Sequence, residues 1–161
     1  MDYDISEGVE VIEAMTQWVT YMLDGEKYGI DVMLVKEVLR NIEIAPVPGA
    51  PDYILGIINL RGNVVTVIDT RTRFGLASKE IDGNSRVIVI ETEDQSVGIL
   101  VDAIAEVADI PKSEIEVTPN VGNDDSSKYI MGVYSGKGNL IILVEIEKLL
   151  TEEEWSEMES F

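Results

Sequence analysis

The chain has 161 residues, 45% of them apolar, and a formal net charge of −19, with 31 acidic and 12 basic side chains. This length fits one domain or two very small ones, and the apolar share is that of a folded protein. The acidic charge makes nucleic acid and bare membrane poor partners, while the absence of cysteine and histidine removes disulfides, thiolate nucleophiles and zinc-thiolate sites. We therefore expect no metal and no cofactor.

The N-terminal residues 1–15 carry five acidic side chains and little periodicity, which indicates a loose arm or a short frayed helix. They lack the basic-then-apolar layout of a secretory signal. No apolar run in the chain approaches the roughly 20 residues that cross a bilayer. We expect a soluble cytoplasmic protein without direct membrane insertion.

The first half of the chain predicts two β-hairpins joined by a connector. Asp24-Gly25, between two β-rich runs, is a strong turn signal. The segment 44–56 holds three of the five prolines and predicts a connector with at most one helical turn. A second turn is expected at Arg61-Gly62-Asn63, where glycine and asparagine tolerate positive φ. The predicted strands are 17–23, a strand from Lys27, Ile57–Leu60 and Val64–Ile68.

A short helix capped by Asp69 or Thr70 and a polar loop should follow, after which the chain repeats itself. Residues 53–69 are echoed at 129–145, with roughly 13 of 17 aligned pairs identical or chemically close. Residues 28–38 are likewise echoed at 97–107. Two copies of one β unit, at about 17–76 and 86–150, are the simplest account.

The composition of the strands predicts an all-β fold with two closed barrels packed on each other. Val64–Ile68 and Leu140–Val144 are apolar at nearly every position, so both of their faces should be covered. A unit of about 60 residues has a thin core, and packing against the other copy adds buried area. The segment 151–161 predicts a helical tail with a capping box at Thr151 and Glu154. Its expected buried contacts are Leu150, Trp155 and Met158.

Catalysis would have to rest mainly on carboxylates. Asp69-Thr70 and its counterpart Glu145-Ile146 resemble an aspartic-protease pair only in part, because Arg71 stands where that site needs a glycine. A carboxylate-dependent hydrolase is the less favoured alternative, and the favoured interpretation is that both carboxylates cap or end strands. Residues 124–128 are too short for a calcium loop and indicate an acidic turn. We expect no catalytic residue.

The two copies differ most at Asn59-Leu60-Arg61, which faces Ser135-Gly136-Lys137. Arginine presents a planar fork that grips carboxylates or carbonyls and is favoured at interfaces. By residue type alone, Arg61 is as well explained by an internal pair with Glu37 or Asp69 as by a partner contact.

Val32, Val35 and Val38 recur at a spacing of three residues in the segment 31–39. The first interpretation is that they pack in the first barrel. If some remain exposed beside Arg61, they form an apolar patch rimmed by charge, which is typical of a docking site.

These motifs together resemble the CheW family of chemotaxis coupling proteins. The residues that carry the resemblance are YGIDVMLVKEV at 28–38, the connector ending in Tyr-Ile-Leu-Gly at 53–56, and Asn-Leu-Arg-Gly followed by an apolar strand that ends in Asp69. The resemblance covers about 17–150. Thr66 and Thr70 depart from the family pattern, which usually has proline and leucine there.

The resemblance implies a CheW-like domain at 16–150, built from two SH3-like five-stranded barrels and followed by the tail. It implies a non-catalytic adaptor that links methyl-accepting chemoreceptor tips to the regulatory domain of the histidine kinase CheA, at receptor clusters of the inner membrane. A similar adaptor of another CheA-type pathway is the alternative. Kinase contacts would use the ends of both barrels, and Gly56 and Gly98 would shape a groove between subdomains. The implied receptor-facing residues are Val32, Val35, Glu37, Val38, Asn59, Leu60 and Arg61.

Overall fold

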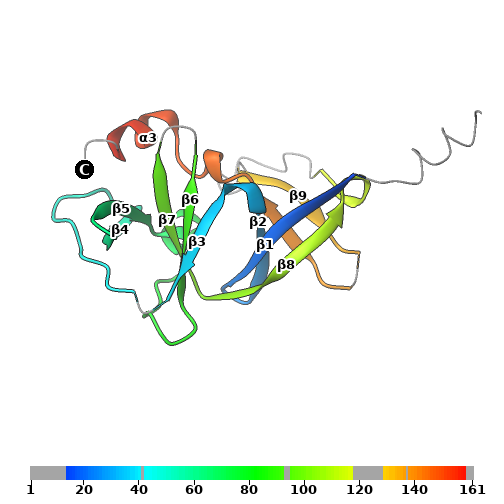
Figure 1. Cartoon of the computed structure of the whole chain (residues 1–161), viewed down its shortest axis with the longest axis horizontal. Helices are drawn as coiled ribbons and strands as arrows, with labels where there is room; N and C mark the ends of the chain where they lie inside the picture. Colours follow the sequence, from blue (N-terminus) through cyan, green and yellow to red (C-terminus); the bar gives the residue numbers. More distant parts are fainter. Residues whose placement is uncertain (1–13, 41, 93–94, 118–128, 137, 159–161) are drawn as a thin grey trace, which may run out of the picture.

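The computed structural model describes residues 14–40, 42–92, 95–117, 129–136 and 138–158, and these form mainly β-strands (Figure 1). The strands are β1 (Met15–Leu23), β2 (Glu26–Asp31), β3 (Val35–Leu39), β4 (Ile54–Leu60), β5 (Asn63–Ile68), β6 (Arg86–Glu91), β7 (Ser96–Val101), β8 (Ala103–Pro111), β9 (Ile130–Tyr134) and β10 (Ile141–Val144). The short helices are η1 (Val32–Leu34), α2 (Thr70–Arg73), η2 (Lys112–Glu114), η4 (Ile146–Lys148) and α3 (Glu152–Met158). Most of the expected arm at 1–15 lies outside the described residues, and Met15 already begins β1.

The predicted all-β fold with two five-stranded barrels is confirmed. Barrel 1 has the strand order β8-β1-β2-β10-β9, and barrel 2 has the order β3-β6-β7-β5-β4. In each barrel one parallel pair joins two hairpins: β2 with β10, and β5 with β7. Single bridges, from Glu116 to Val133 and from Ala45 to Ile57, continue the sheets beyond β9 and β4.

The barrels divide the chain differently from the two sequence copies. The hairpin β1–β2 of the first copy lies in barrel 1 with β8, β9 and β10 of the second copy. The hairpin β6–β7 of the second copy lies in barrel 2 with β3, β4 and β5 of the first. The boundaries at about 17–76 and 86–150 therefore delimit the copies and not the barrels. Hydrophobic periodicity marks where strands lie in the sequence, but it does not say which strand pairs with which.

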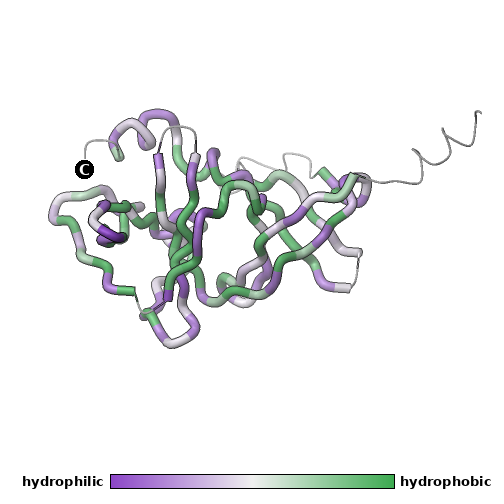
Figure 2. Tube along the Cα trace, in the orientation of Figure 1, coloured by the Kyte–Doolittle hydropathy of each residue, from purple (hydrophilic) through white to green (hydrophobic). Residues whose placement is uncertain are grey.

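The chain has one apolar cluster inside each barrel and a larger one between the barrels, which explains why the central strands are apolar on both faces. Side chains alternate along a strand, so Val87 and Val89 of β6 point into barrel 2 while Ile88 and Ile90 belong to a larger cluster between the barrels. This joint core also takes residues from barrel 1, such as Ile30. Figure 2 shows hydrophobic segments running along the strands in the middle of the molecule. The predicted packing of the barrels on each other is thus confirmed.

The C-terminal helix α3 begins with the predicted capping box. Glu154 Oε1 accepts a hydrogen bond of 2.8 Å from the Thr151 N–H, and Thr151 Oγ1 accepts one of 3.1 Å from the Glu154 N–H. Leu150 and Met158 are 3% exposed within the joint core, and Trp155 packs against that core. The helix therefore packs against the core that lies between the two barrels.

Candidate functional site

Arg61 and Gly62 form a two-residue turn between β4 and β5, with φ values of 51° and 88°. Both residues adopt the left-handed region, which gives a tight hairpin the twist of its strands. Asn59 supports the turn, because its Oδ1 accepts a hydrogen bond of 2.9 Å from the Gly62 N–H. Asn63, expected in the turn, instead begins β5 opposite Leu60. Left-handed backbone costs a non-glycine residue roughly 1–2 kcal/mol, so the hairpin holds Arg61 under strain.

Arg61 forms a two-pronged ion pair with Glu37 of β3. Its Nη1 donates to Glu37 Oε1 at 3.3 Å, and its Nη2 donates to Glu37 Oε2. The hydrogen bond from Arg61 lowers the pKa of the Glu37 carboxyl, and the same bond raises the pKa of the guanidinium. The Arg61 side chain is nevertheless 68% exposed. The internal pair with Glu37 is confirmed, and an ion pair this exposed contributes little to stability.

A β-bulge at Lys36 places two of the predicted valines on one face of β3. Val35 and Val38 pair with β6 residues of the joint core, whereas Glu37 pairs with Val89 of the barrel 2 core. Val35 is half-buried against the joint core, and Val38 is 41% exposed. The valines and the ion pair of Glu37 therefore lie on opposite faces of one strand.

The remaining predicted contact residues have different environments. Val32 is half-buried in η1, at the point where the chain crosses from barrel 1 to barrel 2. Leu60 is half-buried against the barrel 2 core. The structure thus brings Arg61, Glu37 and Asn59 together at one turn, but it does not gather all seven predicted residues into one patch.

Close packing inside barrel 2 explains the glycines at 56 and 98. A Cβ at Gly56 would lie 2.4 Å from the carbonyl oxygen of Ala45 in the connector. A Cβ at Gly98 would lie 2.8 Å from Val87 Cγ1. Both approaches are shorter than real Cβ contacts. Packing within one barrel is therefore sufficient to require glycine at both positions.

The candidate carboxylates have local structural roles. Asp69 caps α2, where its oxygens accept hydrogen bonds from the Thr72 N–H at 3.1 Å and the Thr72 hydroxyl at 2.8 Å. Glu145 ends β10 and pairs with Lys148 at 3.3 Å. Among the described residues, no group of three or more histidine, cysteine, aspartate or glutamate side chains could hold a metal ion. The predicted capping and strand-ending roles are confirmed.

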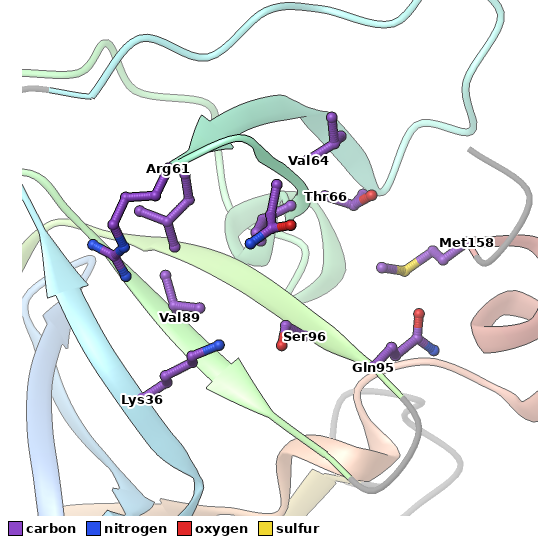
Figure 3. Close-up of a pocket in the computed structure, with 11 residues that line it drawn as sticks. Lys36, Arg61, Val64, Thr66, Val89, Gln95, Ser96 and Met158 are labelled. Atoms are coloured by element: carbon purple, nitrogen blue, oxygen red, sulfur yellow. The ribbon is translucent and has the colours of Figure 1, made fainter.

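Sequence reasoning missed Met33, which is 85% exposed in η1. The turn that presents Met33 is fixed, because Asp31 Oδ1 accepts a hydrogen bond of 2.9 Å from the Met33 N–H. The only sequence signal was a methionine between Val32 and Leu34 in an apolar run that follows a predicted strand. Sequence reasoning also missed a surface groove that Arg61 shares with Lys36 and Met158 (Figure 3).

Comparison with known proteins identifies the family of this chain. The sequence model of the CheW-like domain matches residues 17–154. The chain belongs to the CheW family. It is 33% identical over 138 residues to the chemotaxis protein CheW of Klebsiella aerogenes, covering 86% of this chain and 83% of that protein. It is also 33% identical over 142 residues to the chemotaxis protein CheW of Bacillus subtilis, covering 88% and 91%.

A solved structure of the same family agrees with the fold. The scaffolding protein TtCheW from Thermoanaerobacter tengcongensis superposes with a TM-score of 0.75 at 34% identity, covering 81% of this chain and 89% of that one. The chain is therefore a chemotaxis coupling adaptor of the CheW family, a class of scaffold proteins. No helix in the described part of the chain combines the length and apolar character needed to cross a membrane.

Proposed function

We propose that this CheW-family chain is a non-catalytic adaptor that binds methyl-accepting chemoreceptor tips and the regulatory domain of CheA at the same time. Simultaneous binding raises the effective concentration of the kinase at the receptor. Any preference for one conformational state of a partner then transmits the signal. The adaptor works in the cytoplasm, recruited to receptor clusters at the inner membrane.

The observation that carries the receptor assignment is the exposed Arg61 on its strained turn. The guanidinium offers five donors in a fixed fork, of which Glu37 takes two. A carboxylate or carbonyl group of the receptor tip is a matching acceptor. The receptor tip lies across β3, so that it meets the ion pair on one face and Val35 and Val38 on the other. Met33 on the neighbouring η1 adds an exposed apolar contact.

The test is calorimetric titration of the full chain with a receptor-tip fragment and, separately, with the regulatory domain of CheA from the same organism. We expect saturable one-to-one binding in both titrations. Arg61→Glu should weaken only the receptor titration, because it removes the fork and places a second carboxylate beside Glu37. A hot-spot loss of about 2 kcal/mol corresponds to roughly 30-fold in Kd.

Lys79→Glu is the control, because it makes the same kind of charge reversal at another exposed pair, Lys79–Asp82 at 3.5 Å. Unchanged receptor affinity in a folded Arg61→Glu variant would overturn the receptor assignment. Absence of binding to either partner by the folded wild-type chain would overturn the proposed function and direct attention to another CheA-type pathway.

A further inference from the structure

The short helix α2 projects from barrel 2 into the joint between the barrels. The chain passes between the two barrels, which lie side by side (Figure 1), at η1 and again at Asp102, between β7 and β8. These crossings keep the barrels together, and the joint core adds a hydrophobic attraction that has no preferred direction. Contacts with a defined direction gather instead at α2 and at Phe74, the residue that follows it.

The ring of Phe74 contacts two tyrosine rings of barrel 1. Its centre lies 5.3 Å from that of Tyr28 in β2 and 4.9 Å from that of Tyr129, just before β9. Tyr28 in turn stacks on Tyr21 of β1 at 5.7 Å. The Tyr129 hydroxyl also donates to the Arg73 carbonyl at 2.6 Å. Aromatic rings pack in preferred relative positions, so this series of four rings fixes where Phe74 lies against barrel 1.

Arg71 ties α2 to the turn between β1 and β2. Its Nε and Nη2 donate to the two carboxylate oxygens of Asp102, at 3.2 and 2.6 Å. Asp102 Oδ2 also accepts a hydrogen bond of 2.8 Å from the Asp24 N–H in that turn. The side chains of Arg71 and Asp102 are only 12% and 16% exposed. A shielded two-pronged pair of this kind has a specific geometry, so it connects barrel 2, the second crossing and barrel 1 in one arrangement.

Arg73 makes a second two-pronged pair, with Glu154 of α3. Its Nη1 and Nη2 donate to the Glu154 carboxylate oxygens at 2.9 and 3.0 Å. Its Nε donates to the Leu149 carbonyl at 3.1 Å, on the segment that follows β10 of barrel 1. Residues two apart in a helix point to nearly opposite sides. Arg71 and Arg73 therefore hold α2 from both sides.

The internal repeat indicates that these contacts are not required to build a barrel. The two hairpins at 53–69 and 129–145 are related by an offset of 76 residues. At this offset, the counterparts of the two arginines and of Phe74 are Glu147, Leu149 and Leu150. The second copy thus completes its hairpin and the helical turn after it without either arginine or the aromatic ring. The three side chains of the first copy serve the joint.

We propose that α2 is an orientation lock, in which Arg71, Arg73 and Phe74 are positioning residues that hold the two barrels at one fixed mutual angle. Domains within a chain move relative to one another unless their interface holds them, and the lock supplies the directional part of that hold. A partner on barrel 1 and a partner on barrel 2 then stand in a fixed relative orientation. This inference goes beyond the proposed function, because the lock belongs to the chain itself, whichever partners bind.

Residual dipolar couplings of the backbone N–H groups, measured in a stretched neutral gel, report the orientation of both barrels in a common frame. The couplings of the wild-type chain should fit a single alignment tensor. The double variant Arg71→Gln, Arg73→Gln should lose this common tensor: each barrel should still fit its own structure, but with tensors of different magnitude. Arg86→Gln is the matched control and should keep the single tensor, because Arg86 donates to the Gly83 and Ser85 carbonyls, at 3.0 and 2.8 Å, within barrel 2.

A folded double variant that keeps a single tensor would overturn the lock, as would a wild-type chain whose barrels need separate tensors. Couplings that no longer fit barrel 2 by itself would also overturn it, because α2 would then support that barrel and not the joint. The single change Arg71→Gln should show the same loss to a smaller extent, and it decides the case if the double variant does not fold. These measurements contain no partner, so failure of the lock leaves the proposed function standing.

Discussion

Replacing Arg61 by glycine separates the internal role of this side chain from its partner role. Glycine adopts the φ of 51° without the strain that arginine carries, so the change regains roughly 1–2 kcal/mol. Losing the exposed pair with Glu37 costs little, and the greater freedom of unfolded glycine costs about 0.5–1 kcal/mol. These terms nearly cancel, so the free energy of unfolding should change by no more than about 1 kcal/mol. Receptor affinity should fall roughly 30-fold.

Urea unfolding and calorimetric titration with a receptor-tip fragment measure the two effects. Arg61→Ala is the comparison variant, because alanine keeps the left-handed strain but loses the ion pair. The glycine variant should therefore be the more stable of the two by about 1 kcal/mol. Both variants should lose receptor affinity equally. Destabilisation above about 2 kcal/mol in both variants would mean that the pair with Glu37 is structural. Wild-type receptor affinity in the glycine variant would refute the partner role.

Further predictions concern packing, pH and cooperativity. Gly56→Ala should lower the free energy of unfolding by about 1–3 kcal/mol, because moving the Ala45 carbonyl away weakens the two backbone hydrogen bonds between Ala45 and Ile57, each 2.8 Å long. Gly83→Ala is the control, because a Cβ at Gly83 meets open space. Equal melting temperatures for the two variants would contradict the packing argument. Burial raises the pKa of Asp102, but hydrogen bonds from Arg71 and a backbone N–H outweigh it and leave the pKa lowered. The stability from this lowered pKa is therefore present above the unfolded-state value and lost as the pH falls through the folded-state value. Asp102→Asn should cost stability at neutral pH and approach the wild type as the pH falls below the folded-state pKa of Asp102. A difference independent of pH in urea unfolding would refute this role. Because each barrel needs a hairpin from the other copy, a fragment ending at residue 76 should show no cooperative unfolding by circular dichroism, and a sharp transition would argue against the exchange.

Local signals predicted the elements of the fold with few errors. Asp24-Gly25 forms the first hairpin turn, with positive φ at both residues. Asp69 caps α2, and Thr151 begins the capping box of α3. Each of these features depends on residues within four positions of one another, so it can be predicted from a short stretch of sequence. Residue type allowed Arg61 two internal partners, Glu37 and Asp69, and only the tertiary placement of β3 beside the β4–β5 turn selected Glu37.

The candidate site was less predictable because a bulge changes which side chains share a face. In a regular strand, positions 35 and 38 point to opposite sides. The extra residue at Lys36 puts Val35 and Val38 on the same face and separates them from Glu37. The spacing of the valines does not predict this bulge. The groove between Arg61 and Met158 was also not predictable, because it joins residues almost a hundred positions apart in the chain.

The sequence by itself determined the hairpins, their duplication, the all-β class and the family, because turn residues, strand periodicity and motif spacing are local patterns that can be recognised without a structure. Only the tertiary structure decided that the two copies exchange their first hairpins, that a third core joins the barrels, and that α3 reaches the groove beside Arg61. The physical reason is that strands with two apolar faces can pair in several ways with equal local preference. The choice among those pairings is made by the total apolar area that the complete chain buries.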